Sequence, residues 1–383
     1  MAGCSGDNLR AIVRSVVVLL VCGACNAVDV DLLGQIASPC DLGEVGTWID
    51  VTPGGVMQID PNPGVRGLVM DPLDASVLYA STHEQGVWRS GDCGATWEHM
   101  NTGINGPVIE RASPIDIAMD PFVPDTIYLS PRFGGNSVYT STNRGIHWDD
   151  IIPEAIARQV IDSDLADIAK LAVDPNTPNH ILATSMVPWL GHGDDSGVLE
   201  GRRVDDEWQW TLHPPAPGMG VAQYIEFLDA RTWLLASSYV PTGEGTWITR
   251  DAGTTFARVD DAEAASSWQI YRSVDGTLYR PFQQGLLRSS DGGSTWTDVF
   301  VGIGIGGAQA IIGDGTTLYV SSSVPDGDTA PRMFSAPEDP GDRGWAVVGE
   351  PSPHSVHRFV RDSLRDVLYT FNPYEGVRRK RLR

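Results

Sequence analysis

Acidic side chains are the groups of this sequence best suited to chemistry, because a carboxylate can act as acid, base, nucleophile or metal ligand. The most conspicuous ones recur in one pattern. The stretch Ser289–Trp296 reads S-S-D-G-G-S-T-W, and three related stretches put Asp92, Asn143 and Asp251 where this one has Asp291. An Asp at such a place accepts hydrogen bonds from backbone N–H groups of its own turn, and glycines permit the positive φ that tight turns need. We therefore interpret these four residues as structural.

A second acidic group lies in the loop Trp189–Gly197, which contains His192, Asp194 and Asp195. Oxygen ligands of this kind could hold a divalent ion, but an exposed polar loop is the interpretation we favour. The sequence has no nucleotide-binding glycine loop, no H-E-x-x-H and no G-x-S-x-G. We therefore expect neither a metal nor a cofactor.

The elements that must position these residues repeat along the chain. Each repeat has an apolar strand, an Asp-Pro or Asp-Gly turn and a second strand, followed by a third strand, the D-x-G turn and a T-W strand. Seven copies can be followed by one residue of the second strand: Tyr79, Tyr128, Leu182, Leu235, Tyr279, Tyr319 and Tyr369. A four-stranded propeller blade takes ~40–50 residues, which matches this spacing. The aromatic residues that close the turns are expected to wedge between blades, and Trp296 to bury most of its ring: Trp97, Trp148, Phe256 and Trp296.

The two ends of the repeat region complement each other. The last copy stops at Gly376–Arg379, a third strand with no fourth strand after it, while Thr47–Val51 is a T-W strand with no blade before it. The sequence therefore predicts an all-β fold, a single seven-bladed β-propeller over 45–383, closed by an N-terminal strand that completes the last blade. Closure leaves only short, protected sheet edges. We interpret the basic run Arg378–Arg381 as a solvated end of that blade.

The repeats resemble known families. The pattern S-x-D-x-G-x-T-W resembles the Asp-box, or BNR repeat, of sialidase-like propellers. Sialidases hold the substrate carboxylate with three arginines and have an Arg-Ile-Pro motif before the first blade, where this chain has Gly64–Gly67. The arginines near inner segments match no such triad: Arg66, Arg132, Arg272 and Arg358. Sialidase activity is therefore not expected.

The amino-acid sequence of the repeats resembles xyloglucanase-type glycoside hydrolases and sortilin-like propellers more closely than it resembles sialidases. In the former, a catalytic Asp lies in an inner strand that Ile115–Pro121 resembles, with Asp116 at the matching place. That family uses two tandem propellers with one carboxylate from each, whereas this chain has room for one propeller. The alternative is that Asp116 only lines the central channel. The chain also resembles, in size and blade count, the single seven-bladed propeller of a photosynthetic assembly factor.

The starts of the inner strands should line one mouth of the channel and form its ligand-binding face. They fall at Arg66, Asp116, Lys170, Glu226, Gln269, Gln309 and His357. Their mixed polarity suits hydrogen bonding to a sugar or a peptide loop. The predicted function is non-catalytic binding of a glycan or an envelope protein by a monomer. The alternative is a glycoside hydrolase that uses Asp116, with Glu226 one intervening blade away as the nearest second carboxylate.

The N-terminal 25 residues are typical of an export signal. Arg10 and Arg14 precede a short apolar run, and Cys22–Cys25 looks like the lipobox of bacterial lipoproteins, with Cys25 as the lipidated residue. An ordinary cleaved signal is the alternative. Residues 26–44 are predicted to form a tether. Outside the signal only Cys40 and Cys93 remain, and in an oxidising compartment they could pair or stay as two thiols.

The net charge of −22 excludes two classes of partner. Nucleic acids and anionic lipid surfaces both require a basic protein surface. Any membrane association should therefore depend on the N-terminal lipid, and we expect an exported protein of the bacterial cell envelope.

Overall fold

The computed structural model describes residues 40–56, 64–123, 125–132, 137–160, 168–185, 187–238, 244–262, 269–299, 307–322, 332–338, 344–348, 356, 358–373 and 376–383. The chain divides into two units, Met1–Ser38 and Pro39–Arg383, and the first lies outside the described residues. The predicted export signal, the lipidation of Cys25 and most of the tether fall there and stay predictions. Within the described ranges, no helix has the length and apolar character needed to cross a bilayer.

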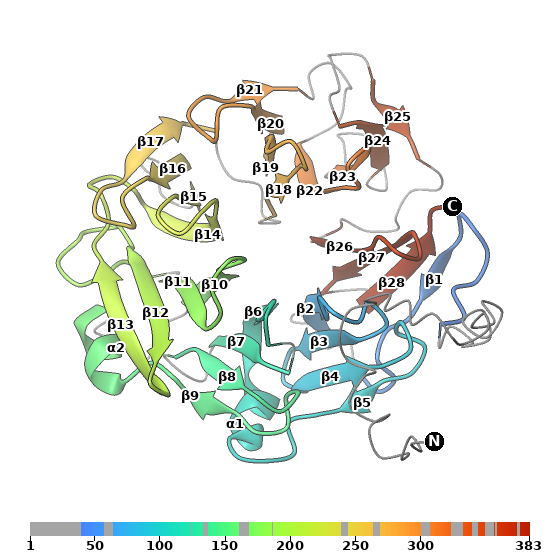
Figure 1. Ribbon diagram of the computed structural model, residues 1–383, viewed down its shortest axis with the longest axis horizontal. Helices are drawn as coiled ribbons and strands as arrows, with labels where there is room; N and C mark the ends of the chain where they lie inside the picture. Colours follow the sequence, from blue (N-terminus) through green and yellow to red (C-terminus); the bar gives the residue numbers. More distant parts are fainter. Residues whose placement is uncertain are drawn as a thin grey trace, which may run out of the picture. The chain divides into compact units, whose positions relative to one another are not determined.

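The second unit consists of seven antiparallel four-stranded sheets around a common axis (Figure 1). Blades 1 to 3 are β2 (Val65–Met70), β3 (Leu78–Thr82), β4 (Val87–Ser90), β5 (Glu98–His99); β6 (Ser113–Met119), β7 (Ile127–Arg132), β8 (Tyr139–Ser141), β9 (Asp149–Asp150); and β10 (Ile168–Val173), β11 (His180–Ser185), β12 (Val198–Val204), β13 (Glu207–His213). Blades 4 and 5 are β14 (Val221–Phe227), β15 (Trp233–Ser238), β16 (Gly245–Thr249), β17 (Ala257–Asp260); and β18 (Tyr271–Arg272), β19 (Leu278–Phe282), β20 (Gly285–Ser289), β21 (Thr297–Asp298). Blades 6 and 7 are β22 (Ala308–Gly313), β23 (Thr317–Ser322), β24 (Met333–Pro337), β25 (Ala346–Val347); and β26 (Arg358–Asp362), β27 (Val367–Asn372), β28 (Gly376–Arg381) with β1 (Trp48–Asp50).

The all-β, seven-bladed prediction is confirmed. Two short helices that the sequence did not predict, α1 (Gly106–Arg111) and α2 (Glu154–Val160), lie in the connections from blade 1 to 2 and from blade 2 to 3. The second strands β3, β11 and β27 are buried along their whole length. Neighbouring blades cover both faces of these strands. For this reason their sequences do not alternate between apolar and charged residues.

The D-x-G turns join the third and fourth strands and are held by their own side chains. The carboxylate of Asp291 accepts hydrogen bonds from the backbone N–H of Thr295 at 2.9 Å and from its hydroxyl at 2.6 Å. The Ser289 hydroxyl accepts one from Gly293, which has a φ of 83°. The Thr295 hydroxyl and backbone N–H hold the pKa of Asp291 well below its usual range. These contacts support the structural interpretation of the turn.

The aromatic residues after these turns are buried to different depths. Trp148 is fully buried, whereas Trp97, Phe256 and Trp296 are half-buried. Trp296 packs on a cluster from blades 4 and 5 that includes Leu234, so it does lie between blades. We expected Trp296 to bury most of its ring, but Trp148 is the residue of this set whose ring is fully buried.

Replacing Trp148 by Ala is expected to lower the free energy of unfolding by about 3–5 kcal/mol, because the ring is enclosed on all sides. The substitution also removes the hydrogen bond from the indole N–H to the Gly145 carbonyl, 2.9 Å long. Trp296→Ala is the matched control at the same place of another turn and should cost less. Denaturant unfolding followed by circular dichroism measures both, and equal losses would contradict this assignment of burial.

The ring closes as predicted. β1 pairs antiparallel with β28, with Trp48 opposite Lys380 and Asp50 opposite Arg378. The Lys380 ammonium lies 5.7 Å from the centre of the Trp48 ring. Arg379 and Lys380 are 4% exposed, so the basic run is an integral part of the closing sheet. The prediction of a solvated end is therefore wrong for these two residues: Lys380 packs on the Trp48 ring of β1, and Arg379 donates hydrogen bonds to the carbonyls of Asp41 and Cys93.

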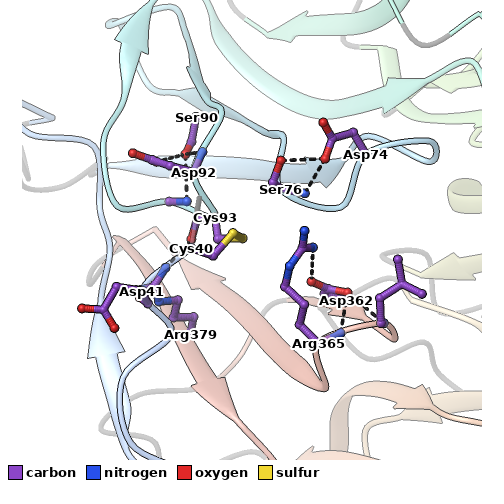
Figure 2. The surroundings of a disulfide bond; sticks show 12 residues. Cys40, Asp41, Asp74, Ser76, Ser90, Asp92, Cys93, Asp362, Arg365 and Arg379 are labelled. Atoms are coloured by element: carbon purple, nitrogen blue, oxygen red, sulfur yellow. Dashed lines mark hydrogen bonds and ion pairs between the residues drawn. A yellow bond between two sulfur atoms is a disulfide. The ribbon is translucent and has the colours of Figure 1, made fainter. Parts of the chain in front are cut away.

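A disulfide between Cys40 and Cys93 joins the segment before β1 to the D-x-G turn of blade 1 (Figure 2). The Arg379 guanidinium lies beside it and donates hydrogen bonds to the carbonyls of Cys93, at 2.7 Å, and Asp41. Strand β28, the segment before β1 and the first blade are thus held together at one point.

Candidate functional site

A cavity of about 390 Å³ lies on the axis of the ring, where the first strands of the blades converge. All seven blades contribute to its wall, and its polar residues come from blades 2, 3, 4, 5 and 7. These polar residues are Asp116, Lys170, Glu226, Gln269, Arg358 and Arg361. The rest of the wall is largely apolar, so charges inside it are poorly solvated and interact strongly.

Asp116 is the centre of this polar group. One carboxylate oxygen lies 2.6 Å from the Lys170 ammonium and accepts the backbone N–H of Leu171 at 3.1 Å. The other oxygen lies 3.3 Å from the Arg358 guanidinium. The Asp116 side chain is 6% exposed, that of Lys170 7% and that of Arg358 31%. The three residues thus join blades 2, 3 and 7 around the axis.

Lys170 is a buried cation in this site. Burial lowers the pKa of its ammonium to about 8, the positive charge of Arg358 acts in the same direction, and Asp116 opposes both. The ammonium also lies 5.6 Å from the centre of the Tyr224 ring, within range of a cation–π interaction. Lys170 is therefore held by Asp116 on one side and by an aromatic face on the other.

Glu226 is the second carboxyl that lines the cavity. The Tyr224 hydroxyl donates a hydrogen bond of 2.6 Å to its carboxylate. Burial nevertheless raises the pKa of Glu226, against the effects of Tyr224, Lys170 and Arg358, and Asp116 adds to the rise. Asp116 and Glu226 line one cavity but differ in partners, because Asp116 is paired with two cations and Glu226 with a neutral hydroxyl.

The sequence predicted Glu226 at the start of its first strand, but it lies next to the end of β14, and the backbone explains why. Five first strands contain an irregularity in their pairing, at 65–67, 114–116, 168–171, 222–224 and 308–310. Asp116 and Tyr224 each follow this irregularity directly, so they occupy equivalent places in blades 2 and 4. Glu226 lies two residues further along the same strand face, nearer the turn.

The other predicted axial residues are placed differently. Gln269 lines the cavity and exchanges two hydrogen bonds of 3.0 Å with the backbone of Phe359. Arg66 and Gln309 lie on first strands but are not among the residues that line the cavity. His357 lies outside the described residues.

Arg358, Arg361 and Tyr224 are the site residues that the sequence missed as binding groups. Arg358 directly follows His357, which the sequence predicted as an axial residue, so this neighbour was the available indication of its position.

In the loop Trp189–Gly197, which was a candidate for metal binding, Asp195 accepts backbone hydrogen bonds from Gly218 and Gly220, at 2.8 and 2.6 Å. Among the described residues, no group of three or more His, Cys, Asp or Glu side chains is arranged so that it could hold a metal ion.

A second buried polar cluster lies on the face of blade 3 that packs against blade 4. Glu200 accepts hydrogen bonds from His180 and His213, both at 2.9 Å, and from Arg202 at 2.9 Å. The other ring nitrogen of His180 lies 2.6 Å from Asp174. The imidazoles of His180 and His213 contact Phe227 and Trp233 of blade 4. This cluster is enclosed, which favours a role in holding the two blades together.

No family model matches the chain. Over 244 residues it is 24% identical to a xyloglucanase from Paenibacillus sp, covering 61% of this chain and 21% of that protein. Over 202 residues it is 25% identical to an oligoxyloglucan-reducing end-specific xyloglucanase from Emericella nidulans, covering 51% of this chain and 24% of that protein. The chain thus spans about a quarter of the length of these curated relatives.

Solved structures support the fold. YCF48 from Cyanidioschyzon merolae matches with a TM-score of 0.58 at 11% identity, over 87% of this chain and 98% of that one. A structure of YCF48 bound to D1 peptide matches with a TM-score of 0.57 at 11% identity, over 88% and 99%. The chain is therefore a seven-bladed β-propeller whose sequence is similar to part of the xyloglucanases.

Proposed function

We propose that this protein is a non-catalytic binding propeller, which takes a segment of a glycan or of an envelope protein at its axial cavity. One observation carries the proposal: both carboxylate oxygens of Asp116 are occupied, by Lys170 and a backbone N–H on one side and by Arg358 on the other. A catalytic carboxylate must be able to contact the reacting atoms of the substrate. A buried carboxylate that is neutralised by two cations is better suited to ordering a binding site.

The second candidate is a glycoside hydrolase of the xyloglucanase type. Two observations favour it: the similarity to xyloglucanases, and the raised pKa of Glu226 in the same cavity as Asp116. Two carboxyls in unequal environments are the arrangement in which one acts as acid and the other as base. In this case Glu226 would be the general acid and Asp116 the base.

The test compares hydrolysis and binding with the same purified protein. Release of reducing ends is measured on xyloglucan oligosaccharides, β-glucans and sialosides, beside a glycan-binding array. We expect no hydrolysis. Glu226→Gln keeps the size and the hydrogen bond with Tyr224, so it should leave the melting temperature nearly unchanged. Hydrolysis by the wild type that Glu226→Gln and Asp116→Asn both abolish, with the fold intact, would establish the hydrolase instead.

A further inference from the structure

The turns between first and second strands share one construction. In six of the seven described turns, an Asp at the end of the first strand accepts the backbone N–H of the residue two positions later. The six acceptors are Asp71, Asp120, Asp174, Asp229, Asp314 and Asp362. This Asx-type turn fixes the backbone and leaves the side chain of the bonded residue in solvent. The side chains at these places therefore form one face of the propeller.

That face has two chemically different parts. On blades 3, 4 and 6 the exposed residue is polar, namely Asn176, Arg231 or Thr316. On the consecutive blades 7, 1 and 2 it is apolar: Leu364 is 88% exposed, Leu73 73% and Phe122 48%. We call these three residues the apolar arc. Exposed apolar side chains grouped in this way are typical of an interaction surface, whereas scattered ones need no explanation.

The apolar arc borders the axial cavity. Pro72 and Pro121, which directly precede Leu73 and Phe122, line the cavity, as does Arg361 in the strand that leads to Leu364. In blade 2, β6 contains Asp116 and ends at Met119, and the turn that follows contains Pro121; both Asp116 and Pro121 line the cavity. A ligand that covers the arc can therefore also reach into the cavity.

The charge inside the cavity selects an anion. Lys170 and Arg358 are two cations that share the single carboxylate of Asp116. Burial raises the pKa of Glu226, the other carboxyl of the cavity. Of Asp116, Lys170 and Arg358, Arg358 has the most exposed side chain, at 31%. An Arg guanidinium in such a setting binds a carboxylate by charge-assisted hydrogen bonds. This local preference is opposite to the overall charge of −22.

We propose that the apolar arc and Arg358 form a docking site for a protein segment that carries an Asp or Glu side chain flanked by apolar residues. The carboxylate goes to Arg358 and the apolar residues cover Leu364, Leu73 and Phe122. This inference rests on the proposed function and narrows its partner. A glycan fits less well, because aliphatic Leu73 and Leu364 offer no hydrogen bonds to sugar hydroxyls. A second copy of this chain would meet the repulsion of two strongly acidic proteins.

The experiment pans a phage-displayed library of random heptapeptides on the immobilised wild-type protein, and measures synthetic copies of the enriched peptides by calorimetry. We expect enrichment of peptides with Asp or Glu next to Leu, Ile, Val or Phe. Changing the acidic residue of the peptide to its amide, or Arg358→Gln in the protein, should weaken binding about tenfold or more. Arg158→Gln, an exposed arginine on α2, is the matched control and should have no effect.

The double variant Leu73→Ser, Leu364→Ser tests the arc without touching the core, and should also weaken the enriched peptides about tenfold. Val274→Ser, on blade 5 and 90% exposed, is its control. Failure to enrich any peptide, enrichment of basic or neutral peptides, or binding that the double variant leaves unchanged would overturn the inference. A glycan array run on the same samples separates the two proposals. Glycan binding without peptide binding overturns only this inference, whereas hydrolysis of the glycans overturns the proposed function itself.

Discussion

Deleting residues 45–52 is expected to open blade 7 and to lower the melting temperature by about 10 °C or more. The deletion removes β1 and the hydrogen bond from Val51 N–H to the Val377 carbonyl, 2.9 Å long. It also removes the Trp48 ring that faces the Lys380 ammonium, and Lys380 is 4% exposed in the closed ring. The edge of β28 would then present unpaired backbone groups to solvent or to other chains. Differential scanning calorimetry at several protein concentrations measures both the melting and any association.

A rescue variant makes this prediction sharper. β1 runs antiparallel to β28 and its first residue, Trp48, lies opposite Lys380. The deleted stretch can therefore be rejoined after Arg383 by a short Gly-Ser linker, so that it returns as the second strand of a hairpin. This variant should recover most of the lost melting temperature. A deletion that melts like the wild type would show that β1 contributes nothing to closure.

Replacing Glu200 by Gln should lower the free energy of unfolding by about 3–5 kcal/mol at neutral pH. The carboxylate is the shared acceptor of His180, His213 and Arg202, and the amide can replace only part of this role. Breaking a buried ionic network by removing one partner leaves the others without compensation. Glu207→Gln, an exposed residue of neighbouring β13, is the matched control and should change little.

The loss caused by Glu200→Gln should also depend on pH. Burial opposes the charge of Glu200, but hydrogen bonds from His180, His213 and Arg202 outweigh it and place its pKa well below the usual range. A carboxyl with a depressed pKa in the folded state contributes stability above its unfolded pKa of about 4.3, and this stability is lost as the pH falls toward the folded pKa. The difference between wild type and variant should therefore shrink from pH 7 to pH 3.5. Urea unfolding at both pH values measures it, and an unchanged difference would contradict the network.

The blades and their closure could be predicted because each depends on a local pattern that repeats. The orphan strand Thr47–Val51 identified its partner by similarity to the T-W strands of other blades, and β1 pairs where this similarity placed it. The axial position of Asp116 followed from the same register. The role of Arg358 could not be predicted from one repeat, because its ion pair with Asp116 joins two different blades, 2 and 7.

The burial of individual aromatic residues, and polar clusters built from several strands, could not be predicted from the sequence. Trp148 and Trp296 occupy the same place in similar turns, yet the connection after blade 1 covers only the former, where Asn105 donates a hydrogen bond to the Trp148 carbonyl at 2.8 Å. The Glu200 cluster draws on β11, β12 and β13, and depends on which residues of three strands face the same neighbour. Neither property is encoded in one repeat.

The closure by β1 has a consequence for the order in which the molecule is made. β1 belongs to the part of the propeller that is synthesised first, and its partner β28 is synthesised last. Blade 7 cannot be completed during synthesis, so a nascent chain with six finished blades still has an open gap. The disulfide from Cys40 to Cys93 spans only 53 residues and can form once blade 1 has folded in an oxidising compartment, before blade 7 is complete. It would then keep the waiting strand beside the gap until the end of the chain arrives.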